Sequence, residues 1–565
     1  MTIMIKIILI LSYLACDYQA FVDRLASVGG GAALLVFFAL YALLAASLFL
    51  CAFIRAHTVR VALAALFSAA SVFQQSFEWT TQGAFTYEAF LNLYNASGQI
   101  GDAVAQHGQV LFKTILAAAL LFLGIALPPR RVRFDPRFAP AALLIAFGTL
   151  SGLLYLRGGE GSRALPAAYP AISYVTLMAG ERLLEDKGPR EKVAIQRNAV
   201  PVARDIVLLV DESVSGNYLD INNRNGVRSG LLEPRARMRL VNFGYAGSIH
   251  RCSANSNIVL RYGGTQKNYQ QAIAHWPSIW NYARQAGLRT VYIDGQSTGG
   301  ELQNMMDKAE RSEIDDFIQF DGTPAVERDM RIAATLADRI NNGRPEFILV
   351  NKVGAHFPIQ DKFPEAATQY RPVLERGDHP LAIWTSDRIG FNGSAEEWVR
   401  YRNSYRNTLL WNVGTFFDRL LDKADLSKAT ILYTSDHGQD LHERGNPGNN
   451  THCGAEFAAQ EEGLVPLAVI EGASGRSLDW ASALAANRNG SNHFRIFPTL
   501  LVLMGYDRPE VRERYGSPLD EAGEPALAYN VNFYTYLGRT PEFRQIELRE
   551  IVDPPASDYN ALARK

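Results

Sequence analysis

Apolar residues are concentrated in the first part of the chain, up to about Arg157, where they form five long runs. Each run is close to the ~20 mostly apolar residues that a helix needs to cross a membrane. The runs extend from Ile3 to Phe21, Gly30 to Ile54, Val59 to Phe77, Gln109 to Leu127 and Ala139 to Leu156. We therefore predict a transmembrane domain of five helices over residues 1–157.

The first run also has an alternative interpretation, as a signal peptide that is removed from the mature protein. Only Lys6 precedes its apolar core, and Cys16-Asp17-Tyr18 lacks the small residues of a cleavage site. We therefore favour a retained membrane anchor.

Charged residues between the runs predict how the five helices are oriented. The loop from Glu78 to His107 contains acidic residues but no Lys or Arg. The loops on either side of it in sequence are basic, with Arg55, His57 and Arg60 in one and Arg130, Arg131, Arg133 and Arg137 in the other. Since Lys and Arg accumulate in cytoplasmic loops, everything after Leu156 should lie outside the cytoplasm. In a bacterium with two membranes, that compartment is the periplasm.

The rest of the chain has the pattern of a soluble domain. Residues 158–203, which begin with a Gly-rich stretch and contain Pro166 and Pro170, are interpreted as a periplasmic linker. From Asp205 onward, short apolar strands alternate with amphipathic helices such as Tyr401 to Leu421. The predicted strands are Ile206 to Val210, Leu288 to Ile293, Phe347 to Val350, Ala429 to Tyr433 and Val465 to Ile470. This alternation predicts an α/β domain over residues 204–565, with a mostly parallel sheet between helices.

Charge and cysteine content restrict the partners and the compartment. The net charge is −1, so no overall basic field points to nucleic acid as a partner. Cys16 and Cys51 fall in apolar runs, which leaves Cys252 and Cys453 in the large domain. An oxidising compartment would allow these two to form a disulfide, and two buried free thiols are the alternative.

The most informative motif is Asp436-His437-Gly438, directly after the predicted strand Ala429 to Tyr433. Open α/β sheets carry functional side chains at the carboxyl ends of their strands. A carboxylate oxygen and an imidazole nitrogen together suit Zn²⁺ or a related divalent ion. The ordinary alternative is that Asp436 caps a turn and His437 packs on it.

Other polar residues also follow predicted strands. Glu212 comes after the first one, where it is either a metal ligand or a carboxylate favoured by a helix dipole. His356, in Gly354-Ala355-His356-Phe357-Pro358, has either a structural role or the role of a general acid or phosphate ligand. His452 follows a Gly/Asn-rich loop that could close over a substrate or a second ion.

A polar turn from Cys252 to Asn257 leads into an apolar helix. Ser253, Asn255 and Ser256 are all good helix caps, so an ordinary N-cap is one interpretation. The other is a nucleophilic hydroxyl at a helix N-terminus, where backbone N–H groups hold a phosphate and a metal ion lowers the hydroxyl pKa.

Taken together, Glu212-Ser213, Cys252 with Ser256 four residues later, His356, Ser435-Asp436-His437-Gly438 and His452 resemble the alkaline phosphatase/sulfatase superfamily. With the five-helix anchor, the chain looks most like the bacterial inner-membrane phosphoethanolamine transferases that modify lipid A or lipooligosaccharide. The resemblance implies that Glu212, Ser256, Asp436 and His437 bind zinc and that Ser256 is the nucleophile. It places His356 and His452 on the substrate phosphate or a second zinc ion, with His356 as the proton donor.

Two further positions are implied as substrate-binding residues. Asn407 lies in Tyr405-Arg406-Asn407-Thr408, which resembles a segment of those enzymes, and Asn92 lies in the outer loop. The chain also departs from the family pattern. Its nucleophile would be serine instead of threonine, Gln439 stands where many members have Glu, and Asn351 replaces a histidine.

The function implied by the resemblance is metal-dependent transfer of phosphoethanolamine from phosphatidylethanolamine to an envelope glycolipid or glycan, such as lipid A or lipopolysaccharide core. It would use one or two Zn²⁺ ions and a phosphoserine intermediate. A phosphoglycerol transferase and a sulfatase-like hydrolase are alternatives, although no Cys/Ser-x-Pro-x-Arg sequence surrounds Cys252 or Ser256. A membrane-anchored glycan-binding or sensor protein without catalysis is the alternative from another class.

Overall fold

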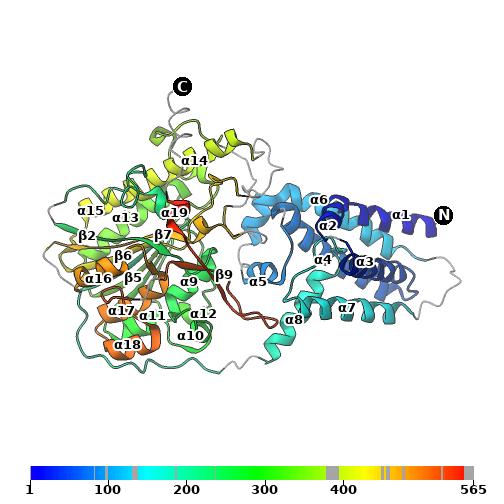
Figure 1. Cartoon of the computed structure of the whole chain (residues 1–565), viewed down its shortest axis with the longest axis horizontal. Helices are drawn as coiled ribbons and strands as arrows, with labels where there is room; N and C mark the ends of the chain where they lie inside the picture. The colour runs from blue at the N-terminus through cyan, green and yellow to red at the C-terminus, as the bar shows by residue number, and fades with distance from the viewer. Residues whose placement is uncertain are drawn as a thin grey trace. The chain divides into compact units, whose positions relative to one another are not determined.

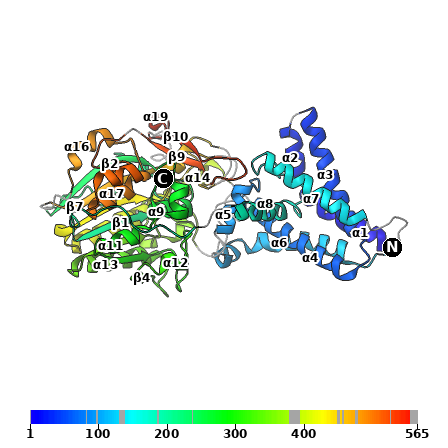
Figure 2. The same ribbon diagram turned by 90° about the horizontal axis from the view of Figure 1, so that it is seen from below.

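The computed structural model describes residues 2–28, 30–81, 83–95, 100–129, 138–184, 188–235, 237–376, 393–446, 451–453, 458–473, 478–523 and 526–552. The chain forms two compact units, shown in Figures 1 and 2. The first, here called the helical unit, comprises Met1–Asp186 together with Tyr534–Thr540. The second, the α/β unit, comprises Lys187–Phe533 and Pro541–Lys565. The region that we interpret as a linker, residues 158–203, is thus shared between the two units.

The helical unit is built from helices that cover the five apolar runs. They are α1 (Thr2–Ala15), α2 (Tyr18–Val28), α3 (Ala32–Cys51), α4 (His57–Thr81), α5 (Tyr87–Asn95), α6 (Ile100–Ala126), α7 (Phe138–Leu156) and α8 (Pro170–Leu184). Within the described residues, α3 and α7 are long and apolar enough to cross a membrane. The pair α1 and α2, bent by 57°, adds a third span if it counts as one. Spans on α4 and α6 remain a prediction from the sequence.

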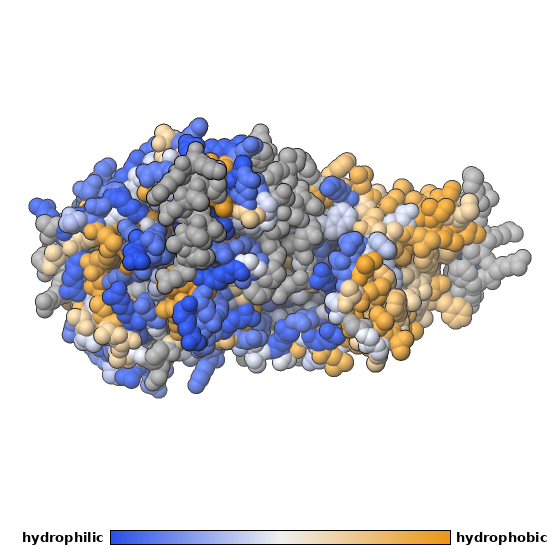
Figure 3. All heavy atoms as spheres, turned by 45° about the horizontal axis from the view of Figure 1, so that its top comes forward, coloured by the Kyte–Doolittle hydropathy of each residue, from blue (hydrophilic) through white to orange (hydrophobic). Residues whose placement is uncertain are grey.

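Apolar side chains cover much of the outer surface of the helical unit, as the orange area of Figure 3 shows. Leu35, Leu144, Ile145 and Leu156 are all more than half exposed. Soluble proteins rarely expose apolar surface of this extent. The surface is that of a protein embedded in lipid.

The α/β unit contains an eight-stranded sheet with the order β4-β3-β5-β1-β6-β7-β2-β8. The strands are β1 (Asp205–Asp211), β2 (Met238–Gly247), β3 (Arg289–Asp294), β4 (Asp316–Ile318), β5 (Glu346–Asn351), β6 (Ala429–Ser435), β7 (Leu464–Gly472) and β8 (Ser491–Asn492). Strands β4, β3, β5, β1 and β6 are mutually parallel, whereas β7 runs antiparallel to β6 and β2. The prediction of a mostly parallel sheet between helices is confirmed. Two further strands, β9 (Ala528–Asn532) and β10 (Glu542–Gln545), form a separate antiparallel pair.

Helices cover both faces of the large sheet (Figure 1). The helices of the α/β unit are α9 (Ser253–Tyr262), α10 (Tyr269–His275), α11 (Ile279–Gln285), α12 (Lys308–Arg311), α13 (Ala325–Asn341), α14 (Ala395–Leu409), α15 (Phe416–Lys423), α16 (Trp480–Asn487), α17 (Ile496–Leu503), α18 (Arg508–Tyr515) and α19 (Leu548–Ile551). Val207, Leu209, Val291, Ile348 and Ile431 point from one face into a core shared with α13, α14 and α15. Because side chains alternate along a strand, the residues between them face the other layer.

The parallel register brings several strand ends to one edge of the sheet. Asp211 at the end of β1 pairs with Ser435 at the end of β6, and Val210 pairs with Asn351 at the end of β5. Asp294 at the end of β3 also pairs with Asn351. The segments that follow these four strands therefore begin side by side.

A buried ion cluster lies directly beneath this edge. Lys352 Nζ is 2.7 Å from Asp211 Oδ1 and 3.9 Å from Asp329 Oδ2, and all three side chains are fully buried. Asp329, on α13, also accepts hydrogen bonds from the backbone N–H groups of Val353 and Gly354. The cluster therefore joins β1, α13 and the segment that follows β5.

Replacing Lys352 with methionine should strongly destabilise the protein, because it leaves Asp211 and Asp329 as uncompensated buried charges. We expect the free energy of unfolding to fall by about 3–5 kcal/mol. Urea unfolding of the detergent-solubilised chain measures this loss. The exposed residue Lys423, at the end of α15, provides the control, and Lys423→Met should change the value by less than about 0.5 kcal/mol.

Cys252 and Cys453 form a disulfide, with Cα atoms 5.1 Å apart and a separation of 201 positions in sequence. Cys252 immediately precedes α9, and the backbone N–H of Cys453 donates to Glu462 Oε2. Among the described residues, Cys16 and Cys51 remain as free thiols. The disulfide joins the start of α9 to the segment that contains His452.

Peptide mapping without reduction should recover the Cys252 and Cys453 peptides as one linked species. Closure of so long a loop should stabilise the folded state, so the double variant Cys252→Ser/Cys453→Ser should lose about 2–5 kcal/mol in urea unfolding. The variant Cys16→Ser is the matched control. Recovery of both cysteines as alkylated free thiols from the untreated protein would contradict the assignment.

Candidate functional site

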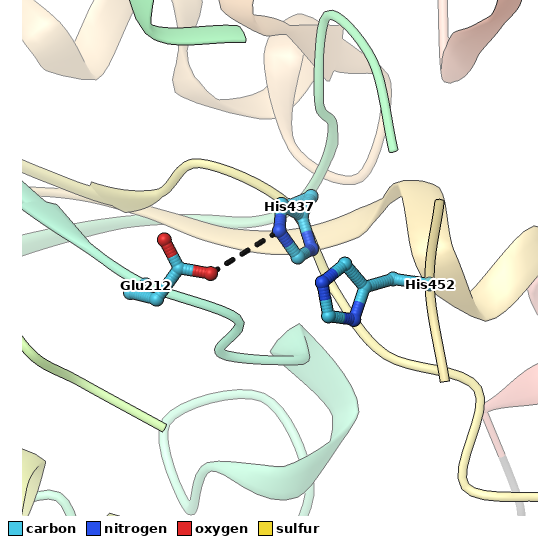
Figure 4. A group of neighbouring side chains, drawn as sticks. All are labelled: Glu212, His437 and His452. Carbon is cyan, nitrogen blue, oxygen red and sulfur yellow. Dashed lines mark ion pairs between the residues drawn. The ribbon is translucent and has the colours of Figure 1, made fainter. Parts of the chain in front are cut away.

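Three side chains converge at the carboxyl edge of the sheet, as Figure 4 shows. Glu212 follows β1, His437 follows β6, and His452 belongs to the segment held by the disulfide. Glu212 Oε1 is 3.3 Å from His437 Nε2, and the rings of His437 and His452 stack with their centroids 4.4 Å apart. One potential ligand atom from each residue lies within 4.8 Å of the other two, which is close enough to share a metal ion.

Asp436 adds a fourth group to this cluster. Its Oδ1 accepts hydrogen bonds from the backbone N–H groups of Ser213 and His437, and it lies 3.9 Å from His437 Nε2. Its Oδ2 is buried and has no hydrogen-bond partner in the part of the chain that the structure describes. A buried carboxylate oxygen without a partner is costly, and a bound ion is one of the accepted reasons for it.

The hydroxyl in the cluster belongs to Ser253, the first residue of α9. Its Oγ lies 3.1 Å from His437 Nε2 and 3.2 Å from Glu212 Oε1. Ser256, which the sequence led us to expect here, lies one turn further along α9. The Ser256 hydroxyl instead donates to the carbonyl of His250 and accepts from its N–H. Of these two serines, Ser253 is therefore the one whose hydroxyl lies in the cluster.

The buried carboxylates of the cluster favour positive charge beside them. Burial alone would raise the pKa of Glu212, but the hydrogen bond and charge of His437 hold it well below its usual range. Burial and the neighbouring Glu212 raise the pKa of Asp436 well above its usual value. Burial would lower the pKa of His437, yet Asp436 and Glu212 outweigh it and raise this pKa to about 9. Two carboxylates in a fully buried space thus favour a bound cation.

The donor set fits a divalent metal ion. His437 Nδ1 is 2.7 Å from the carbonyl of Gly438, which can only accept, so the ring proton is held on Nδ1 and Nε2 can bind a metal. Two carboxylates, an imidazole and a hydroxyl make a four-atom set of the kind that zinc uses. Burial, and then the charge of His437, lower the pKa of His452 well below its usual value, so this second imidazole is neutral.

His356 lies at the margin of the cluster. It is half-buried, and its Nδ1 lies 2.7 Å from the carbonyl of Phe357. Burial lowers the pKa of His356, and the charge of Glu212 opposes this shift. His356 therefore lies within electrostatic range of Glu212, in the segment that Asp329 holds through Val353 and Gly354.

Of the other two expected substrate residues, Asn407 is not brought into this cluster. Asn407, on α14, is fully buried, and its amide accepts from the N–H groups of Gln369 and Tyr370 and donates to the carbonyl of Tyr370. We therefore assign Asn407 to holding this loop. Asn92 lies on α5 of the helical unit, and its role in substrate binding stays a prediction from the sequence.

Sequence reasoning missed Gln296, whose side chain Nε2 lies 3.0 Å from Glu212 Oε2. A signal was present, because the predicted strand Leu288 to Ile293 ends in Asp294-Gly295, immediately before Gln296. Ser253 also carried a signal as one of three candidate caps in its turn. Because Ser253 is the first residue of α9, its hydroxyl, rather than that of Ser256, reaches the residues that follow the strands.

Known proteins are similar to this chain in sequence and in fold. Two proteins of Escherichia coli (strain K12) are similar in sequence: Kdo(2)-lipid A phosphoethanolamine 7''-transferase, 22% identical over 262 residues, and phosphoethanolamine transferase EptC, 25% identical over 171 residues. The matches cover 44% and 30% of this chain, and 43% and 27% of the respective relatives. The chain is thus matched to less than half the length of either relative.

The fold matches that of a solved membrane protein over nearly the whole chain. The integral membrane lipooligosaccharide phosphoethanolamine transferase A (EptA) from Neisseria meningitidis aligns with a TM-score of 0.64 at 17% identity. The alignment covers 91% of this chain and 98% of that structure. At this identity, the likeness establishes the fold.

The family model for sulfatases matches residues 204–506. This region is more than half of the chain, and it contains Glu212, Ser253, Asp436, His437 and His452. The chain belongs to the sulfatase family.

Proposed function

We propose that this protein is a zinc-dependent phosphoethanolamine transferase of the bacterial inner membrane, with its α/β unit in the periplasm. It would move phosphoethanolamine from phosphatidylethanolamine to an envelope glycolipid or glycan, such as lipid A or lipopolysaccharide core. The observation that carries the proposal is the Ser253 hydroxyl, placed within 3.2 Å of both Glu212 Oε1 and His437 Nε2. The names of the two Escherichia coli relatives support the choice of phosphoethanolamine as the transferred group.

Glu212, Asp436, His437 and the Ser253 hydroxyl are the residues that would hold zinc. When bound, zinc would lower the pKa of the hydroxyl and turn it into a nucleophile. Ser253 begins α9, so the first backbone N–H groups of this helix are available to a phosphate oxygen. His452, which is neutral and stacked on His437, can donate a hydrogen bond to the same phosphate without adding charge.

The reaction proceeds in two displacements. Ser253 Oγ forms a bond to phosphorus, and the bond from phosphorus to the diacylglycerol oxygen breaks. The Ser253 proton passes to His356 and from there to the leaving oxygen. In the second displacement, an acceptor hydroxyl attacks the phosphoserine, its proton returns to Ser253 through His356, and the product leaves. A neutral imidazole suits this relay, and burial favours that form by lowering the pKa of His356.

The apolar helices fit this chemistry because the donor is a lipid and an acceptor such as lipid A is also a lipid. A membrane anchor concentrates the α/β unit where both substrates are found, whereas a hydrolase of soluble esters has no need of one. The departures of the chain from the family pattern, including serine as nucleophile, leave the acceptor open. Mass shifts of envelope lipids identify it and also separate phosphoethanolamine from phosphoglycerol as the group transferred.

Ser253→Ala should abolish transfer, because it removes the attacking oxygen. We expect a fall of about 10³-fold or more in the release of diacylglycerol from phosphatidylethanolamine. Ser256→Ala is the matched control on the same helix and should retain most of the activity. Intact-mass analysis of the wild-type protein should find a phosphoethanolamine adduct on Ser253. Activity in Ser253→Ala, or an adduct on Ser256, would reject the assignment.

Metal analysis of the purified chain should find zinc, and chelation should remove both zinc and activity. Asp436→Asn and Glu212→Gln should each weaken zinc binding by more than about a hundredfold, since even outer-shell changes cost about 10–100-fold. Asp422→Asn, whose side chain is 70% exposed, is the control and should bind zinc like the wild type. A purified chain that is fully active without metal would refute this part of the proposal.

A further inference from the structure

The side chain of Gln296 reaches from the segment after β3 to the back of Glu212. Its Nε2 lies 3.0 Å from Glu212 Oε2, 3.0 Å from the carbonyl of Lys352 and 3.3 Å from Asn351 Oδ1. All three neighbouring atoms are hydrogen-bond acceptors. Only the NH₂ end of the amide satisfies them, so the orientation of Gln296 is determined.

Gln296 is itself held in place by Asp294, the last residue of β3. Asp294 is fully buried, and its Oδ1 accepts from the backbone N–H of Gln296 and from Gln303 Nε2, at 3.0 and 2.6 Å. Asn351 Nδ2 donates to the same oxygen, and Gln319 Nε2 donates to Oδ2. The Asp294 carboxylate, which accepts hydrogen bonds from side-chain amides, therefore fixes the turn that places Gln296 beside Glu212.

This contact makes the two oxygens of Glu212 unequal. Oε2 accepts from Gln296, whereas Oε1 lies 3.3 Å from His437 Nε2 and receives the hydroxyls of Ser213 and Ser253. Asp436 shows the same division. Its Oδ1 accepts two backbone N–H groups, and its Oδ2 is the buried oxygen without a partner among the described residues. Each carboxylate thus has one oxygen that accepts from amide N–H donors of the surrounding fold, Glu212 Oε2 and Asp436 Oδ1.

We propose that Gln296 is a positioning residue that restricts Glu212 to binding the metal ion through a single oxygen. Together with the backbone N–H groups on Asp436, it creates a compact set of single-atom ligands. Such a set suits four-coordinate zinc, whereas calcium takes six to eight oxygens and often binds both oxygens of a carboxylate. The inference rests on the proposed zinc site and explains how the protein selects the ion.

The test uses the full-length chain in detergent, with Zn²⁺ or Ca²⁺ added alone. Gln296→Leu removes the donor at similar volume, and Gln296→Glu keeps the shape but places a carboxylate against Glu212 Oε2. We expect both variants to lose zinc affinity by about 10–100-fold in competition with a chelator. X-ray absorption of the zinc-loaded Gln296→Leu protein should show an additional oxygen ligand relative to wild type. The preference of the Gln296→Leu protein for Zn²⁺ over Ca²⁺ should also fall.

Gln303→Leu is the matched control, because Gln303 also donates to Asp294 but makes no bond to Glu212. It should bind zinc like the wild type. If both Gln296 variants bind zinc with unchanged affinity and coordination, the inference is wrong while the proposed function stands. Equal losses in Gln303→Leu and Gln296→Leu would also overturn it, since the effect would then belong to the Asp294 turn. A wild-type chain that binds no zinc would reject both the inference and the zinc-dependent function.

Discussion

Buried carboxylates meet at one edge of the sheet, and the surrounding parts of the α/β unit compensate their charge. Asp211 and Glu212 are consecutive at the end of β1, so their side chains point to opposite sides of the extended chain. Asp211 faces Lys352, 2.7 Å away, whereas Glu212 faces His437 and lies near Asp436. One side of the strand end is neutralised by a lysine, and the other side carries the cluster that we propose to bind zinc.

The two consecutive residues thus have different roles: Asp211 belongs to a stabilising ion pair, and Glu212 belongs to the candidate site. The ion pair of Lys352 is closed, because its partners, the carbonyl of Asn412 and the ring of Phe416 surround the ammonium group. The cluster around Glu212 still contains an unsatisfied hydrogen-bond acceptor, because Asp436 Oδ2 has no partner among the described residues. A buried ion pair holds geometry better than it adds stability. Here it holds the segment after β5, which contains His356, next to the cluster.

Backbone geometry explains why these segments approach so closely. Gly354 has a φ of +54°, and a Cβ at this position would lie 2.6 Å from the backbone N and O of Glu212. Ser213 has a φ of 61°, a conformation that a residue with a side chain rarely adopts. It is kept there by Asp436 Oδ1 on its N–H and by the Tyr405 hydroxyl on its carbonyl. The strained turn lies beside Glu212, as is common where a protein holds a functional side chain.

The sequence by itself determined the fold class, the strand ends that carry the site and the chemical character of the cluster. Short apolar runs that alternate with amphipathic helices reflect local burial, and Asp436-His437 and Glu212 follow strands that these runs identify. Only the tertiary structure placed the hydroxyl of Ser253, rather than that of Ser256, against Glu212 and His437, because this depends on where α9 begins relative to strands distant in sequence. The same holds for Gln296 and Asn407. An amide looks alike in sequence whether it supports a ligand or a loop, and only its hydrogen-bond partners across the fold distinguish the two roles.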